Sequence, residues 1–221
     1  MLTNERQSSS CTELFKAAYE NRYTWESQFL GYEGNCSWTD DKREIKGTFI
    51  LGQDLKALVN GIDDEHINKA ISSQLWEVAI HRVRRSFEQT HGENTFKFGD
   101  RNEIGSEIIV GGKNEGDKYR VKNDVVTMVY RHIHGSLIVI HTKEVTQTGK
   151  GYLSKSYSSQ YLDPISKKDL QVRNFYKDEF LPLDKGGAWV LASRSIHQES
   201  LEGSILNKQV FSFSDLKALN T

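Results

Sequence analysis

The chain has 221 residues, with 29 Lys and Arg against 30 Asp and Glu, and its formal net charge is −1. This balance lacks the basic field on which non-specific binding to nucleic acid depends, so no nucleic-acid partner is expected. Hydrophobic residues make up only 37% of the chain, but 10 Phe, 9 Tyr and 4 Trp are among them. Large rings bury much apolar area per residue, and the chain can therefore form an adequate core.

The N-terminal residues and the cysteines predict a cytoplasmic protein. Residues 1–11 lack the apolar segment of a secretory signal. No run approaches the roughly 18 apolar residues that a membrane span requires. The two cysteines, Cys11 and Cys36, fall in different predicted elements. They are expected to be free thiols in a reducing compartment.

The first part of the chain is predicted to contain a helix, three strands and a longer helix. Residues 1–10 are expected to be flexible, and Ser10 with Glu13 has the capping-box pattern that starts a helix over about residues 11–22. The apolar period then changes from 3.6 to 2, which predicts strands near residues 30–38, 44–51 and 55–59. Acidic residues at 63–65 precede the main helix, which is expected over about residues 64–90.

The rest of the chain is predicted to be a β-meander. Nine strands are expected between residues 95 and 214, joined by short turns such as Gly135-Ser136. The fold class is therefore α+β and mainly antiparallel β, in one domain over residues 1–221. We expect about ten strands or more in a large curved sheet, a half-barrel or open barrel, with the long amphipathic helix covering its concave face.

The main helix carries the first candidate site residues. By helical angle Arg82 falls inside the apolar stripe that includes Leu75 and Ala79, whereas Arg84 lies on the opposite side. A guanidinium that faces a core must be paired. Two interpretations follow: an ion pair with a strand carboxylate such as Glu179 or Glu144, or a cavity in which Arg82 binds an anionic head group. Trp76 of the same helix is a further candidate for ligand contact.

A second candidate site lies on the hairpin around residue 135. If Gly135-Ser136 is a two-residue turn, His134 pairs with Leu137, His132 with Val139 and Tyr130 with His141. The three histidines then share one face, either as surface side chains or as ligands of a metal or tetrapyrrole. Because no Cys, Asp or Glu lies beside them on that face of the two strands, and no His-Glu-x-x-His pattern occurs, we assign no metal site. Ligand candidates here are Tyr130, His132 and His134.

Catalytic patterns are missing from the sequence. No Gly-x-Ser-x-Gly element occurs, and residue spacing supports neither a Cys–His pair nor a carboxylate pair. The glycine-rich segment 111–118 lacks the Ser or Thr and the helix of a phosphate-binding loop, and it is interpreted as a hairpin. No catalytic residue and no cofactor are assigned, and a non-enzymatic role is favoured.

Four segments resemble a family of cyanobacterial and chloroplast proteins without an assigned activity: residues 13–25, 74–92, 131–135 and 149–154. The resemblance covers about residues 12–214 and implies a photosynthetic lineage, but it supplies no functional residues. At fold level the order of elements is similar to the half-barrel of periplasmic lipoprotein carriers, which hold acyl chains under a helical lid. That likeness is one of architecture, and the missing export signal argues against lipoprotein trafficking itself.

The leading hypothesis is a non-enzymatic intracellular binding or chaperone-like module. Its curved sheet would hold a hydrophobic or amphipathic ligand, a lipid or a pigment, or else a photosynthesis-related partner protein. One alternative is a lyase-like enzyme that handles a tetrapyrrole in a pocket lined by His132, His134 and Arg82. Another is a purely structural subunit that docks through an apolar patch or an edge strand. The sequence does not separate these hypotheses or fix the oligomeric state.

Overall fold

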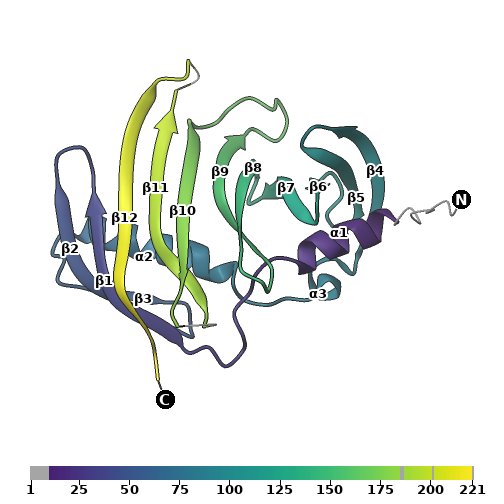
Figure 1. Ribbon diagram of the computed structural model, residues 1–221. Coiled ribbons are helices and arrows are strands. Elements are labelled where there is room, and N and C mark those ends of the chain that lie inside the picture. Colours follow the sequence, from purple (N-terminus) through teal and green to yellow (C-terminus); the bar gives the residue numbers. More distant parts are fainter. Residues whose placement is uncertain (1–9, 185–186, 201, 221) are drawn as a thin grey trace, which may run out of the picture.

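The computed structural model describes residues 10–184, 187–200 and 202–220 (Figure 1). Helices in these residues are α1 (Cys11–Glu20), α2 (Glu65–Ile80) and α3 (Phe87–His91). The strands are β1 (Gly31–Thr39), β2 (Glu44–Gly52), β3 (Ala57–Asn60), β4 (Asn94–Asn102), β5 (Gly105–Gly112), β6 (Lys118–Lys122), β7 (Val125–Ile133), β8 (Ser136–Gln147), β9 (Tyr152–Leu162), β10 (Arg173–Pro182), β11 (Trp189–Glu199) and β12 (Ile205–Ala218). The flexibility expected for residues 1–9 lies outside the described residues.

The twelve strands form one open, curved sheet, which confirms the predicted fold class. Their order is β3-β2-β1-β12-β11-β10-β9-β8-β7-β6-β5-β4, and the paired neighbours are antiparallel. Strands β4 to β12 are the predicted meander, and β12 returns to pair with β1. Because β3 and β4 lie at opposite edges of the sheet, the segment between them has to cross from one edge to the other. This segment contains α2 and α3 (Figure 1).

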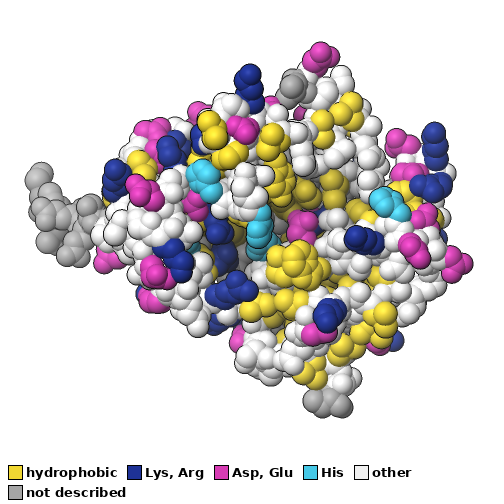
Figure 2. All heavy atoms as spheres, turned by 180° about the vertical axis from the view of Figure 1, so that it is seen from behind, with side chains coloured by type: hydrophobic (Ala, Val, Ile, Leu, Met, Phe, Trp, Pro, Cys, Tyr) yellow, Lys and Arg dark blue, Asp and Glu magenta, His cyan; other side chains and the backbone are white. Residues whose placement is uncertain are grey.

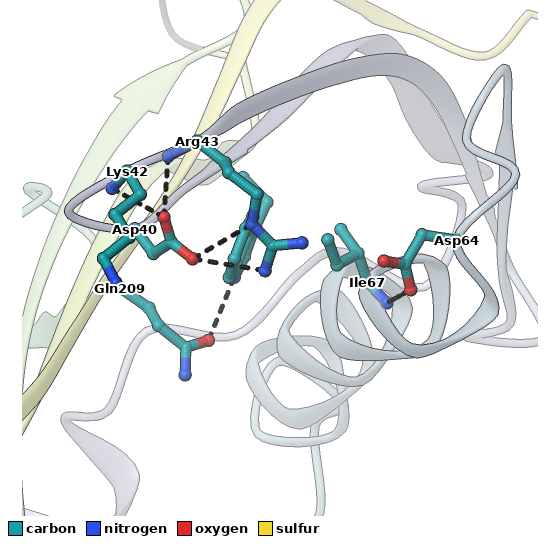
Figure 3. A network of polar contacts seen from close by, with 7 residues as sticks. Asp40, Lys42, Arg43, Asp64, Ile67 and Gln209 are labelled. Carbon is teal, nitrogen blue, oxygen red and sulfur yellow. Dashed lines mark hydrogen bonds and ion pairs between the residues drawn. The ribbon is translucent and has the colours of Figure 1, made fainter.

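Short polar contacts fix the first hairpin and the start of α2 (Figure 3). The carboxylate of Asp40 accepts hydrogen bonds from the backbone N–H of Lys42 at 2.8 Å and of Arg43 at 2.7 Å. These contacts make the predicted turn between β1 and β2. At the start of α2, the Asp64 carboxylate accepts a hydrogen bond from the backbone N–H of Ile67 at 3.2 Å. Asp64 is the N-cap of this helix, as the acidic run at 63–65 predicts.

The N-terminal helix begins where the capping-box pattern predicts. The Ser10 hydroxyl accepts from the backbone N–H of Glu13 at 3.2 Å, and the Glu13 carboxylate accepts from the backbone N–H of Ser10 at 2.8 Å. The helix ends at Glu20 with Asn21 as its C-cap, two residues earlier than expected. Phe15 and Ala18 are fully buried on its inner side.

The main helix is shorter than the sequence predicts, because α2 ends at Ile80 and a separate helix, α3, begins at Phe87. Ser86 is the N-cap of α3, with φ −65° and ψ 158°, and it forms a capping box with Gln89. A residue held in this extended conformation cannot continue a helix. The turn over residues 81–86 is fixed further by the backbone N–H of Trp25, which donates to the carbonyl of Arg82 at 2.8 Å.

Two separate apolar clusters lie on the face of the sheet that the helices cover, which we call the concave face. The first joins α2 to the strands at one end and includes Phe49, Leu51 and Ile71. The second joins α1 and α3 to β5 and β6 and includes Phe15 and Tyr119. Helix α2 contacts β3 and β1, whereas α1 contacts β4, β6 and β7. Strands β8 and β9 therefore lie between the two helix-covered regions in the sheet order.

Candidate functional site

The middle of the concave face is the candidate site. Viewed from the side opposite to Figure 1, hydrophobic side chains are recessed between the two halves of the molecule, with histidine and charged side chains beside them (Figure 2). The concave face of the middle strands is identified by Val129, which packs against the second apolar cluster. Its partner Ile140 and the next alternate residue, Ile138, share this face and are half-buried. Apolar surface is thus available between the two clusters.

Arg82 is buried at the edge of this region. Its side chain comes from the turn after α2, and the residue is 9% exposed. The Nη1 atom donates to the carbonyl of Tyr23 at 3.3 Å, and the guanidinium lies 5.5 Å from the ring centroid of Phe180. The Nε atom is buried without a hydrogen-bond partner among the described residues. Burial lowers the pKa of Arg82 to about 10, although Asp178 raises it.

The predicted ion pair of Arg82 with Glu179 or Glu144 is wrong. Glu179 is exposed, and Glu144 lies 3.8 Å from Lys155. Among the described residues no carboxylate oxygen lies within 4.0 Å of the Arg82 guanidinium. Arg82 is buried and Arg84 is exposed, as predicted, but Arg82 lies in the turn after α2 and not on a helix. The error concerns the partner, because helical angle does not show which strand residue faces a helix.

The charges of Arg22, Arg82 and Arg131 all act on His81 in the turn after α2, and we call these three residues the arginine cluster. The Arg22 guanidinium lies 3.8 Å from the ring centroid of Tyr19, and its Nε donates to the Tyr19 carbonyl at 2.9 Å. The Nε atom of Arg131 is buried without a hydrogen-bond partner, 3.5 Å from a carboxylate oxygen of Asp117. In the described residues, neither Arg22 nor Arg82 forms an ion pair.

The pKa of His81 is lowered in this region, in part by positive charges. The residue is exposed, and the surrounding protein lowers its pKa to about 4. Burial of the ring is the largest cause, and the charges of Arg82, Arg22, Arg194 and Arg131 lower the pKa further. The sequence alone does not indicate this lowered pKa.

Arg194 is a buried arginine that sequence reasoning missed. It is 2% exposed and donates from Nε and Nη2 to the two carboxylate oxygens of Asp178, at 2.8 and 2.7 Å. Its Nη1 donates to Gln74 at 2.9 Å and to Glu77 at 3.2 Å, both on α2, and its Nη2 donates to the Tyr157 hydroxyl at 2.7 Å. Burial lowers the pKa of Arg194, but Tyr157, Asp178 and Glu77 raise it more, so the net shift is upward. This charge is neutralised within the protein.

Trp76 lies on the exposed side of α2. Its side chain is 51% exposed, whereas Leu75, Val78 and Ala79 point into the first apolar cluster. It therefore stands outside the core, at the surface near the end of the helix. Among the described residues, no hydrogen bond or cation–π contact joins Trp76 to the arginine cluster.

The histidine hairpin has a different turn from the one predicted. Ile133 pairs with Ser136, so the two turn residues are His134 and Gly135, with φ 48° and 78°. Two positive φ values are typical of a type I′ turn, whose twist matches that of the strands. His132 consequently pairs with Leu137, and Tyr130 pairs with Val139. The predicted pairings are shifted by two residues, and His134 lies in the turn.

The structure does not bring the histidines together with Arg82. Tyr130 and His132 alternate with Val129 and Arg131 along β7, so they point to the face opposite the apolar clusters. The backbone N–H and Nδ1 of His132 lie 2.9 and 3.1 Å from a carboxylate oxygen of Asp117, which is 3% exposed. The described residues hold no group of three or more potential metal ligands.

A hollow in the surface lies on another part of the sheet. It has a volume of about 610 Å³ and is lined by residues of β1, β2 and β12 such as Asn35, Thr48 and Asp215. Asn35 and Thr48 alternate with the core residues Cys36 and Phe49, so the hollow opens on the convex side. It carries none of the predicted site residues. None of the helices in the described residues is long and apolar enough to cross a membrane.

Comparison with known proteins identifies the family. A solved LolA superfamily protein from Nitrosomonas europaea is 9% identical with a TM-score of 0.35, over 97% of this chain and 96% of that chain. A DUF1329 family protein from Desulfovibrio piger is 11% identical with a TM-score of 0.30, over 95% of this chain and 94% of that chain. No curated protein matches the sequence. The model of DUF3386, described as a protein of unknown function, matches residues 6–219, and the chain belongs to this family.

Proposed function

We propose that this protein is a non-enzymatic binding protein that holds an anionic amphiphile on its concave face. The anionic head would bind the arginine cluster, and the apolar tail would lie on the middle strands. The observation that carries this proposal is Arg82, a buried guanidinium with a free Nε and no carboxylate partner among the described residues. An unpaired buried cation costs several kcal/mol, which an anionic ligand would offset.

The charges around Arg82 support an anion rather than a neutral ligand. The carboxylates of Asp178 and Glu77 neutralise Arg194. Asp117 is shared between Arg131 and His132. This leaves the charges of Arg22 and Arg82 uncompensated by any ion pair in the described residues. A carboxylate or phosphate accepts charge-assisted hydrogen bonds from guanidinium groups, which are about twice as strong as neutral ones.

The middle strands offer apolar surface for the tail of the proposed ligand. Val129, Ile138 and Ile140 share the concave face and are half-buried. Ile138 and Ile140 lie on β8, between the strands that α1 contacts and those that α2 contacts. Each is available to contact an acyl chain or another apolar group, at about 25 cal/mol per Å² of surface removed from water. The cytoplasmic location, the photosynthetic lineage and a photosynthetic partner protein stay predictions. The tetrapyrrole-handling alternative is not retained, because its histidines and Arg82 do not share a pocket.

Paired ligands that differ only in the head group test this proposal. Oleate and oleyl alcohol are titrated into the purified protein while tryptophan fluorescence is recorded. We expect oleate to bind more tightly. Arg82→Gln should weaken oleate binding about 10- to 100-fold, because a hydrogen bond to a charged group contributes about 1.5–3 kcal/mol. The effect on oleyl alcohol should be small.

Arg101→Gln is the matched control, since Arg101 is an exposed arginine on the edge strand β4. It should bind oleate as the wild-type protein does. Arg82→Lys retains the charge and should recover part of the affinity. Equal affinities for oleate and oleyl alcohol, or an Arg82→Gln variant that binds oleate like the wild type, would contradict the proposal.

A further inference from the structure

An exposed apolar segment lies at the C-terminal end of α2. Trp76 and Ile80 are four residues apart and share one side of the helix. Trp76 is 51% exposed, Ile80 is half-buried, and Val83 in the following turn is 41% exposed. This side differs from the buried stripe of α2, and no described element covers it.

Basic side chains accompany this segment. Arg84 and Arg85 follow Val83 directly, and both are exposed. The only acid between residues 76 and 86 is Glu77, whose carboxylate lies 3.2 Å from Arg194. Neither Arg84 nor Arg85 forms an ion pair with a described residue, so the turn presents positive charge close in sequence to an exposed indole. We call Trp76, Ile80, Val83, Arg84 and Arg85 the basic-apolar edge.

We propose that the basic-apolar edge docks on an anionic bilayer surface, with Trp76 and Val83 at the level of the head groups and Arg84 and Arg85 against lipid phosphates. Tryptophan is enriched at membrane–water interfaces, where its ring meets apolar tails and its N–H meets polar groups. Each basic residue near an anionic bilayer contributes about 1 kcal/mol of attraction. Two to three apolar side chains are too few for a stable protein interface, which buries about 800 Å² on each partner.

The position of the basic-apolar edge connects the docking proposal to the proposed function. The docking proposal rests on that function, because the bilayer would be the source of the ligand. Arg82 lies between His81 and Val83 in the same turn, and its side chain is buried. A bilayer docked here would therefore bring lipid head groups to the turn that carries the buried arginine. Weak, reversible attachment is expected, because one indole and two arginines give a small binding free energy.

Vesicle flotation tests the docking. The full chain is mixed with phosphatidylcholine vesicles, with or without added phosphatidylglycerol, at low and at high salt. The wild-type protein should float with the anionic vesicles at low salt and be released by high salt. Arg84→Ser with Arg85→Ser should weaken partitioning about thirtyfold, since two residues at about 1 kcal/mol each are removed. Trp76→Ser should weaken it independently of salt.

Arg101→Ser is the control and should partition like the wild type. Circular dichroism of each variant checks that it is folded. Wild-type protein that fails to float with anionic vesicles, or an Arg84→Ser/Arg85→Ser variant that floats like the wild type, would overturn the docking proposal. The oleate titration of the wild-type protein separates the two proposals: oleate binding without flotation overturns docking alone, and flotation without oleate binding overturns the ligand proposal alone.

Discussion

Removing the carboxylate of Asp178 should destabilise the protein strongly. Arg194 is 2% exposed and makes two hydrogen bonds of 2.8 and 2.7 Å to this carboxylate. In Asp178→Asn the buried guanidinium keeps only the half-exposed Glu77 as a charged partner, at 3.2 Å. Breaking a buried pair on one side costs about 3–5 kcal/mol, because the remaining charge stays buried. We expect a loss of this size in the free energy of unfolding.

Urea unfolding followed by circular dichroism measures this loss. The double variant Asp178→Leu/Arg194→Met removes both charges and should recover most of the stability. Glu77→Gln removes the second charged partner of Arg194 and serves as a comparison. Because the Glu77 side chain is 40% exposed, loss of its charge should lower the free energy of unfolding by less than about 1 kcal/mol. A loss below about 1 kcal/mol in Asp178→Asn, or no recovery in the double variant, would refute the reasoning.

Three further predictions follow from single residues. Burial, with Arg131 and Arg22, lowers the pKa of His91 from 6.5 to about 4. Between pH 6.5 and 4 the unfolded chain then binds more protons than the folded chain, so the free energy of unfolding should fall by about 3 kcal/mol as the pH is lowered over this range. His91→Phe should flatten this pH dependence, which is measured by the midpoint of urea unfolding at each pH. Arg82→Met should raise the unfolding free energy by about 1 kcal/mol while oleate binding is lost; a large destabilisation would indicate a structural role. Ser86→Ala removes the α3 cap and should cost about 1 kcal/mol in the same assay.

Much of the fold could be predicted from the sequence, because local patterns determine it. Period-2 alternation located all twelve strands, and the capping residues Ser10 and Asp64 located the starts of α1 and α2. The break after Ile80 was missed. The capping box of Ser86 and Gln89 was available as a signal, but the apolar repeat continues through Phe87 and favoured one long helix.

The candidate site could be predicted only in part, because it depends on contacts between distant segments. Helical angle predicted that Arg82 is buried, and it is, although it lies in the turn after α2 and not on the expected longer helix. Helical angle could not show that Tyr23 and Phe180, far away in the chain, would be its neighbours in place of a carboxylate. Arg194 lies on a strand with polar neighbours, and nothing local marks it as buried. The hairpin register was missed because a histidine at positive φ is uncommon, and glycine at the first turn position was the simpler prediction.

Native mass spectrometry of gently purified protein, followed by solvent extraction, tests the central claim most directly. The account predicts that the wild-type protein retains an anionic amphiphile, and that Arg82→Gln loses it while Arg101→Gln retains it. The extracted molecule should carry a carboxylate or phosphate on an apolar tail. A wild-type protein that retains no ligand and also takes up none from added anionic lipids would contradict the account, as would equal retention of the ligand by Arg82→Gln.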